Sequence, residues 1–283
     1  MSEIILEAKH IYFSYNNNEQ TPSLNDFSLK IEKGKKIAVM GSNGSGKSTF
    51  FLCCNGIHRP SSGSISFHGK EIGYSRKELL ELRSKIGIVF QDPDDQLFSA
   101  SVYEEISFGL LNLGISEETA RQLVTDIISE LEITPFQDRP THALSGGQKK
   151  QVAIADILVM QPEILILDEP AAALDPKHTD LVRALIDRLS DGDRTILVAT
   201  HDADYAFSWA DEVVLLHEGR VLKSGAPLAV FSDTEVLSQT NLKPPSVLPL
   251  FQTLCRKHIL SQTLPVPRTL KELETLLEDL PEI

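Results

Sequence analysis

The chain has 283 residues, of which 41% are hydrophobic, and its formal net charge is −13. This length suits one large domain, or one domain with a small appendage, and the hydrophobic residues suffice for a sizeable core. The acidic charge argues against a nucleic-acid partner, and no stretch approaches the roughly 18 apolar residues that span a membrane. Because the N-terminus also lacks the pattern of a signal peptide, we expect a soluble, cytoplasmic chain.

The first part of the chain is predicted to form mainly short strands. Apolar runs place them at residues 4–6, 11–15, 27–31, 37–40, 64–67 and 86–90. One helix is expected over 76–83, because Ser75 and Glu78 have the spacing of a capping box at its start.

A glycine-rich loop follows the strand at 37–40. Its pattern is G-x-x-x-x-G-K-[ST], and residues 48–56 can form the helix that this motif requires. Inward-turned backbone N–H groups and the helix N-terminus would hold a triphosphate, Lys47 would reach its β- and γ-phosphates, and Ser48 would ligate Mg²⁺. The residues of the loop are Gly41, Ser42, Asn43, Gly44, Ser45, Gly46, Lys47, Ser48 and Thr49.

The middle of the chain, from about 91 to about 160, is predicted to be helical. Ser116 can cap one of its helices, whose apolar stripe is Leu123, Val124, Ile127, Ile128 and Leu131. An α/β pattern then returns, with a strand at 164–167, a helix at 181–189, a strand at 195–200 and a hairpin at 213–222. Apolar strands that alternate with helices predict a sheet covered on both faces.

Two further motifs follow the phosphate loop in a fixed order. Leu144-Ser145-Gly146-Gly147-Gln148 precedes an apolar strand that ends in Asp168-Glu169. With these motifs, residues 4 to about 225 resemble the ATP-binding-cassette (ABC) ATPases. The resemblance implies ATP hydrolysis with ATP and Mg²⁺ as cofactors, and an α/β P-loop core with an antiparallel β subdomain and a helical insertion. We expect an ATP-binding domain over 1–235 and a small helical C-terminal extension over 236–283.

The resemblance also implies roles for four polar residues that follow strands. Asp168 would contact Mg²⁺ directly or through water, and Glu169 would be the general base for the attacking water. Gln91 would contact Mg²⁺ or that water and sense a transmembrane partner, and His201 would face the γ-phosphate. The alternatives are that the carboxylates cap the next turn, that Gln91 is an ordinary polar loop residue and that His201 is structural.

Two more residues match the family at the ends of the nucleotide. Tyr15 resembles the aromatic residue on which adenine stacks, although strand alternation with Phe13 leaves core packing open and makes Tyr12 the other candidate. Asp175 matches the loop that crosses the dimer interface, and its alternative is an ordinary Asp in a turn.

The signature Ser145, Gly146, Gly147 and Gln148 opens a helix, and so offers N–H groups to an anion. The chain's own phosphate loop already holds its nucleotide, however. In the family, the signature of one subunit binds the γ-phosphate held by another. We therefore expect a head-to-tail pair with a second ATPase subunit, either an identical chain or a paralogue.

The segment from Phe90 to Gly109 resembles the ATPases of energy-coupling-factor (ECF) importers, most of all the cobalt-uptake ATPase. This resemblance implies a transmembrane coupling protein, a solute-binding membrane subunit and a peripheral location on the cytoplasmic face of the cell membrane. We expect the docking groove near Phe98 and Val102. Cobalt is the predicted solute, with nickel and a vitamin as alternatives.

Two other classes of function compete with the importer. A soluble ABC ATPase acting on ribosomes or DNA usually carries two cassettes or a long coiled coil, and neither is evident here. A binding-only regulator would lack Glu169 or His201, and both are present. Asp156 stands where the family often has Arg, and we expect a surface contact or a pair with a nearby Lys.

The C-terminal tail contains two amphipathic patterns. Val247, Leu250, Phe251 and Leu254 are predicted to share one face of a short helix. A second capping box at Thr269 and Glu272 precedes leucines at 270, 273, 277 and 280. This helix could pack on its own chain or contact another subunit, and the pattern leaves both open.

Overall fold

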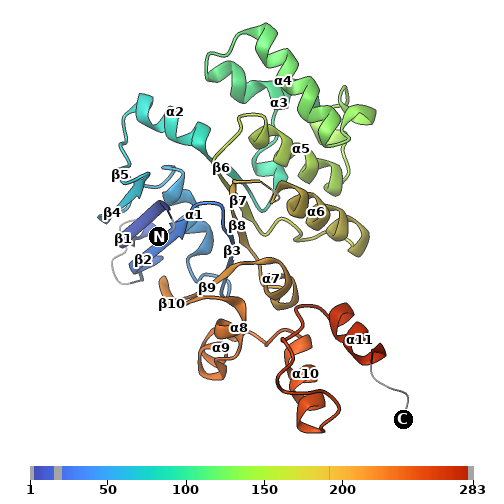
Figure 1. Ribbon diagram of the computed structural model, residues 1–283. Helices are drawn as coiled ribbons and strands as arrows, with labels where there is room; N and C mark the ends of the chain where they lie inside the picture. Colours follow the sequence, from blue (N-terminus) through green and yellow to red (C-terminus); the bar gives the residue numbers. More distant parts are fainter. Residues whose placement is uncertain (1–2, 16–20, 191, 280–283) are drawn as a thin grey trace.

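Two β-sheets form the centre of the molecule, with a helical region at one end and the C-terminal helices at the other (Figure 1). The computed structural model describes residues 3–15, 21–190 and 192–279. The smaller sheet is antiparallel and has the strand order β2-β1-β4-β5, and the larger has the order β10-β9-β3-β8-β7-β6. The strands are β1 (Ile4–Phe13), β2 (Leu24–Glu32), β3 (Lys36–Met40), β4 (Ser62–Phe67), β5 (Lys70–Glu71), β6 (Ile86–Val89), β7 (Ile164–Asp168), β8 (Thr195–Ala199), β9 (Glu212–His217) and β10 (Arg220–Gly225).

Helices cover the larger sheet and extend beyond it. Its neighbouring strands are parallel, except that β10 pairs antiparallel with β9. The fold is therefore the expected α/β core with an antiparallel β subdomain and a helical insertion. The helices are α1 (Lys47–Cys54), α2 (Arg76–Lys85), α3 (Val102–Asn112), α4 (Glu117–Glu130), α5 (Gly146–Leu158), α6 (Pro176–Leu189), α7 (Ala203–Trp209), α8 (Pro227–Phe231), α9 (Thr234–Thr240), α10 (Val247–Arg256) and α11 (Leu270–Glu278).

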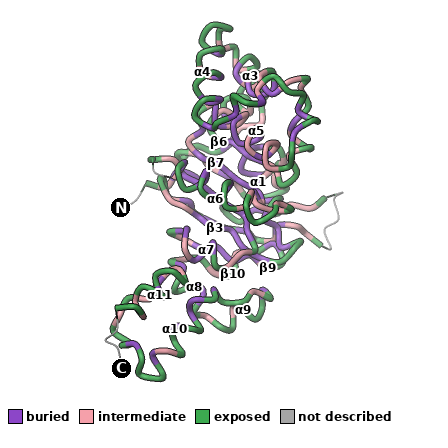
Figure 2. The backbone as a smooth tube through the Cα atoms, turned by 90° about the vertical axis from the view of Figure 1, so that its right-hand side faces the viewer, coloured by how far each residue is buried: buried purple, intermediate pink, exposed green. Residues whose placement is uncertain are grey.

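The central strands of the larger sheet are buried on both faces, as their continuous apolar runs predict. In β3, Ala38 and Met40 pack into one hydrophobic cluster with the helical region, while Ile37 and Val39 pack into the other with β1, β2 and α1. Figure 2 shows the buried residues concentrated along these strands. The carboxyl ends of β3, β7 and β8 are thus fixed on a rigid sheet, and the candidate site lies there.

The first strand differs from the prediction of two separate strands. Residues 4–13 form one strand, and it ends before Tyr15. The pairing with β2 shifts register between Ala8 and Ile11, where His10 has a φ of 47°. This irregularity lets one strand continue through the polar residues that suggested a break.

The helical region and its caps follow the sequence closely. Ser116 caps α4 by accepting from the N–H of Thr119, and most of the predicted apolar stripe is buried. Ser75 and Glu78 form the predicted capping box of α2. Local patterns suffice here because each cap needs only residues three apart.

In the C-terminal helices, two sequence predictions are wrong: the buried face of α10 and the capping box of α11. In α10, Val247 and Phe251 are buried, but Leu250 is 45% exposed and Leu248 is buried in its place. In α11, Thr269 accepts from the N–H of Glu272, but the Glu272 carboxylate accepts from the N–H of Arg268 instead of completing a capping box.

Helix α11 packs on its own chain. Leu273 is 1% exposed, and the Arg268 guanidinium donates to the carbonyls of Phe207 and Ala210 at the end of α7. Leu270 is 47% exposed, and Leu280 lies outside the described residues. In the part of the chain that the structure describes, no helix is long and apolar enough to cross a membrane.

Candidate active site

The phosphate loop connects β3 to α1 and leaves the start of that helix open. Gly46 is the N-cap residue, with a φ of 105°, and no side chain caps the helix. A Cβ on Gly46 would lie 2.7 Å from the carbonyl oxygen of Ser23, so only glycine fits there. The first N–H groups of α1 therefore point free of side chains into the loop, where an anion would find them.

Lys47 lies inside the loop. Its side chain is buried, and its Nζ donates to the carbonyl oxygens of Gly41, at 2.8 Å, and Ser42, at 3.3 Å. A cavity of about 1120 Å³ lies over the loop, and residues 41–49 all line it. The predicted loop residues thus converge on one cavity, with one buried cation at its base.

The two carboxylates at the end of β7 occupy different environments. Asp168 is 6% exposed, and its Oδ1 is a buried oxygen without a hydrogen-bond partner among the described residues. Burial raises its pKa, while the Ser48 hydroxyl and the Lys47 ammonium act in the opposite direction. Mg²⁺ prefers oxygen ligands, and the free carboxylate oxygen of Asp168 and the Ser48 hydroxyl both supply one. These two residues therefore fit that ion.

Glu169 follows Asp168 with a strained backbone, at a φ of 44°. Its N–H donates to the carbonyl of Ala199 at 3.2 Å, which ties the turn to β8. Its Oε2 lies 3.0 Å from Nδ1 of His201, and its side chain is 12% exposed against 76% for that of His201. Burial raises the pKa of Glu169, which suits a residue that accepts a proton.

Gln91 and Tyr15 both line the cavity over the phosphate loop. Gln91 follows β6 and lines the cavity together with Asp168, Glu169 and His201. Tyr15 also lines it, is 47% exposed, and has its hydroxyl 3.3 Å from that of Thr49. The ring of Tyr15 meets that of Phe13 edge to face but is not buried with it, so core packing does not account for this residue.

The signature residues form the start of another helix. Ser145 is the N-cap of α5, and with Gln148 it forms a capping box. A Cβ on Gly147 would lie 2.3 Å from the ring of His178, so α5 approaches the first turn of α6 closely. Asp175 caps α6 and accepts from the N–H of His178 at 3.1 Å.

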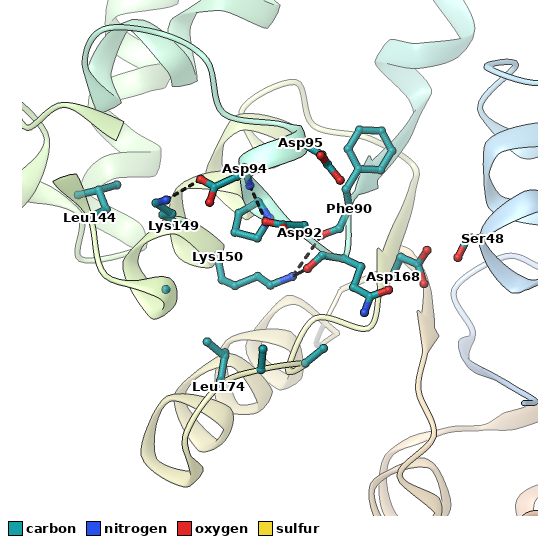
Figure 3. Close-up of a pocket in the computed structure, with 15 residues that line it drawn as sticks. Ser48, Phe90, Asp92, Asp94, Asp95, Leu144, Lys149, Lys150, Asp168 and Leu174 are labelled. Atoms are coloured by element: carbon teal, nitrogen blue, oxygen red, sulfur yellow. Dashed lines mark hydrogen bonds and ion pairs between the residues drawn. The ribbon is translucent and has the colours of Figure 1, made fainter. Parts of the chain in front are cut away.

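The signature residues do not line the cavity over the chain's own phosphate loop. Among the described residues that line the cavity over that loop, none belongs to 144–148. A separate cavity of about 660 Å³ extends from Ser48 and Asp168 to Gly146 and the residues after Gln91 (Figure 3). The start of α5 thus borders this second cavity, which shares Ser48 and Asp168 with the phosphate-loop site, and not the cavity over the loop itself.

Sequence reasoning missed three contributors to this region. Lys150 is buried beneath Gln91, and Gln96 links the same loop to Asp156. Asp156 thus pairs with an amide and not with a Lys or a surface partner. Residues 240–244, at the end of α9 and just after it, line the same cavity as His201. Only the lysine had a sequence signal, namely its place in the signature helix.

This arrangement defines a class of protein: an ATP-binding cassette with a phosphate loop, a carboxylate pair and a separate anion-binding helix. The model of the ABC transporter family matches residues 24–172. An energy-coupling factor transporter ATP-binding protein, EcfA of Methanocaldococcus jannaschii, is 43% identical over 253 residues, or 89% of this chain and 90% of the relative. EcfA3 of Clostridium perfringens is 44% identical over 258 residues, or 91% of this chain and 90% of that one.

Solved structures agree with these relatives. The structure of cbiO1 from Clostridium perfringens, part of the ABC transporter complex cbiONQ, has a TM-score of 0.74 and 44% identity, and covers 90% of this chain and 99% of that one. A dimeric ATP-binding cassette in a post-hydrolysis state, bound to ADP and Pi, has a TM-score of 0.71 and 27% identity over 79% of this chain and 99% of that one. The chain belongs to the ABC transporter family, among the ATP-binding proteins of the energy-coupling-factor type, and it is an ABC ATPase.

Proposed function

We propose that Glu169 is the general base of ATP hydrolysis at this site. The observation that carries the proposal is its position: a shielded carboxylate, held 3.0 Å from His201, next to Asp168, whose Oδ1 is buried and has no hydrogen-bond partner among the described residues. Burial raises the pKa of Glu169, and a base whose pKa is nearer the working pH accepts a proton more readily. His201 would hold the carboxylate in place and face the γ-phosphate.

The remaining residues would bind and orient the nucleotide. Lys47 would exchange its bonds to the carbonyls of Gly41 and Ser42 for phosphate oxygens, and Tyr15 would stack on adenine. Ser48 and Asp168 would hold Mg²⁺, with Gln91 nearby, and the ion would neutralise charge on the β- and γ-phosphates. The free oxygen of Asp168 supports this set of ligands.

The working unit would be a head-to-tail pair of cassettes. The start of α5 lies outside the chain's own phosphate cavity, and a helix N-terminus with two glycines suits an anion. A second cassette, either a copy of this chain or a paralogue, would supply the nucleotide that this helix binds, and Asp175 would lie at that interface. Because ATP would touch both chains only in the closed pair, its binding would favour closure and its hydrolysis would favour opening.

The pair would energise an ECF-type importer from the cytoplasmic face of the membrane. An exposed apolar surface supports docking to a membrane protein: Phe98 is 68% exposed, Phe108 is 45% exposed, and their rings meet edge to face at 4.9 Å. Leu111, 47% exposed, extends it. Val102, which the sequence suggested for this groove, is the first residue of α3 and is fully buried, so it cannot line the groove.

Cobalt is the proposed solute, and it enters through the membrane subunits. The support for cobalt is the similarity to cbiO1 alone. The described residues themselves include no cluster of three or more His, Cys, Asp or Glu that could hold a metal ion. Nickel or a vitamin would be carried by the same ATPase chemistry with a different membrane subunit.

The test is affinity purification of the tagged chain from detergent-solubilised native membranes. We expect a polytopic coupling protein and a solute-binding membrane subunit to co-purify, and the metal or vitamin content of the latter names the solute. Phe98→Glu should lose these partners, whereas Leu181→Glu, a matched change at a 58% exposed leucine on α6, should keep them. Recovery only with ribosomes or DNA-repair proteins would overturn the transport function.

A further inference from the structure

The signature helix is fastened to the loop that carries Gln91 by a buried lysine. Lys150 lies in α5 five residues after Ser145 and is 2% exposed. Its Nζ donates to the carbonyl oxygens of both Phe90, at 3.2 Å, and Gln91 (Figure 3). One ammonium group thus holds two successive carbonyls of the loop after β6.

A second connection holds the same point from the other side. The N–H of Phe90 donates to Oε1 of Gln96 at 3.3 Å, while Nε2 of Gln96 donates to the carbonyl of Ala153 in α5 at 2.9 Å. Lys150 and Gln96 together leave the backbone at Phe90 little freedom to move independently of α5. Nearby, Lys149 pairs at 2.5 Å with Asp94, whose side chain is 65% exposed, and such a pair contributes little.

The burial of Lys150 is costly, which argues for a positional purpose. Among the described residues it has no ion pair within bridging distance, although Asp92, Asp168 and Glu169 act on its charge from further away. Burial lowers its pKa to about 8. A buried ammonium bonded only to carbonyls stabilises a fold less than an apolar side chain of similar size would. Its two bonds instead fix one geometry of the loop.

We propose that Lys150 is a positioning residue that makes the placement of Gln91 depend on the placement of the signature helix. When the γ-phosphate held by a second cassette draws the start of α5 toward it, Lys150 carries the backbone of Phe90 and Gln91 along. The nucleotide bound in trans thereby sets the geometry at the chain's own Asp168 and Glu169. This inference rests on the proposed role of Gln91 and the proposed pairing.

The experiment compares steady-state ATP hydrolysis in Lys150→Met, Gln91→Ala and the double variant, with Lys149→Met as the matched control. Misplacing a positioned group can cost up to about 10²-fold, so we expect Lys150→Met to lower kcat by about tenfold or more while KM for ATP stays within about twofold. In the Gln91→Ala background the same change should cost little more, because both act on one group. Lys150→Arg should recover part of kcat.

Three outcomes would overturn the inference. Lys150→Met could leave kcat within about twofold of wild type while Gln91→Ala lowers it, which would spare the role of Gln91. The losses could add fully, which indicates a general structural effect. An unchanged kcat in Gln91→Ala would instead remove the proposed role of Gln91 itself. If the Met variant does not fold by circular dichroism, Lys150→Gln, which keeps a neutral donor, replaces it in the same comparison.

Discussion

Helices α1 and α5 both begin in a glycine-rich segment, and we propose that both bind an anion there, yet their N-termini are capped differently. The start of α1 has glycine at its N-cap, no side-chain cap and a buried lysine, and it lies under a cavity in its own chain. The start of α5 is capped by Ser145 and Gln148. That box satisfies the N–H groups of these two residues and leaves those of Gly146 and Gly147 without an acceptor within the helix.

The difference teaches which nucleotide each helix serves. The N–H groups at an uncapped, enclosed helix start need a phosphate or another acceptor to bind them. Lys47, whose Nζ donates to the carbonyl of Gly41, lies at this helix start. A capped helix start is stable without a ligand, and only the N–H groups of Gly146 and Gly147 are left to bind one. Under the proposed pairing, the phosphate site at α1 is formed within one chain, whereas the site at α5 requires a nucleotide held by a second cassette.

The largest expected effect falls on the chemistry beside α1. Glu169→Gln should lower kcat by about 10²–10⁴-fold, the usual worth of a general base, and leave ATP binding intact. Phosphate release measures kcat, and nucleotide titration measures ATP binding. The control is Glu163→Gln. Glu163 lies next to the other end of β7, away from the site, where it pairs with His68 and Lys85. Turnover within about threefold of wild type would remove Glu169 from the role of base.

Blocking α5 should be the next largest change. Ser145→Arg places a bulky side chain at an exposed helix start, and losing one preorganised donor to a developing charge costs roughly 10²-fold in turnover. ATP affinity of the single chain should stay within about twofold, because the signature lies outside the cavity over the phosphate loop. A parallel loss of affinity in isothermal titration would contradict the assignment of α5 to another chain's nucleotide.

Removing the cation of α1 should act on binding itself. Lys47→Ala is expected to weaken ATP affinity by about 10–100-fold, since a hydrogen bond to a charged group contributes roughly 1.5–3 kcal/mol. Titration of a fluorescent ATP analogue measures this, with Lys35→Ala as a control at an exposed lysine. An unchanged affinity would show that Lys47 does not meet the phosphates.

The smallest effect on turnover is expected from a change that acts on the stability of α5. Desolvation raises the pKa of Asp156 to about 7, and Gln96 donates to its carboxylate at 3.0 Å. The folded state thus keeps a proton that the unfolded state releases above about pH 4, so stability falls as pH rises from about 4 to 7. A pKa shift from 3.8 to about 7 corresponds to about 4 kcal/mol, so Asp156→Asn should remove this loss and stabilise the chain by up to about 4 kcal/mol at pH 8, with little gain at pH 4. Urea unfolding at both pH values measures it, and an equal gain at both would refute the cause.

The sequence predicts the two helix starts better than it predicts what connects them. The phosphate loop, the Ser75 capping box and the buried strands depend on residues close in sequence, so their patterns are visible. Lys150 and Gln96 act across about 60 residues, and no local pattern marks such contacts.

Burial also depends on how helices meet. Leu250 and Val102 were predicted on the wrong sides because an apolar residue at the edge of a stripe can face either way. The continuous strand β1 was missed because a left-handed His10 lets a strand pass through polar residues.

The most direct measurement is the mass of the Glu169→Gln chain by light scattering, with and without ATP and Mg²⁺. Any second cassette chain that the membrane purification recovers is added in equal amount. Our account predicts one cassette per particle without nucleotide and two with ATP, and loss of the larger particle when Ser145→Arg is added. A single cassette that binds ATP to saturation without any change in mass would contradict the assignment of α5 to a partner's nucleotide.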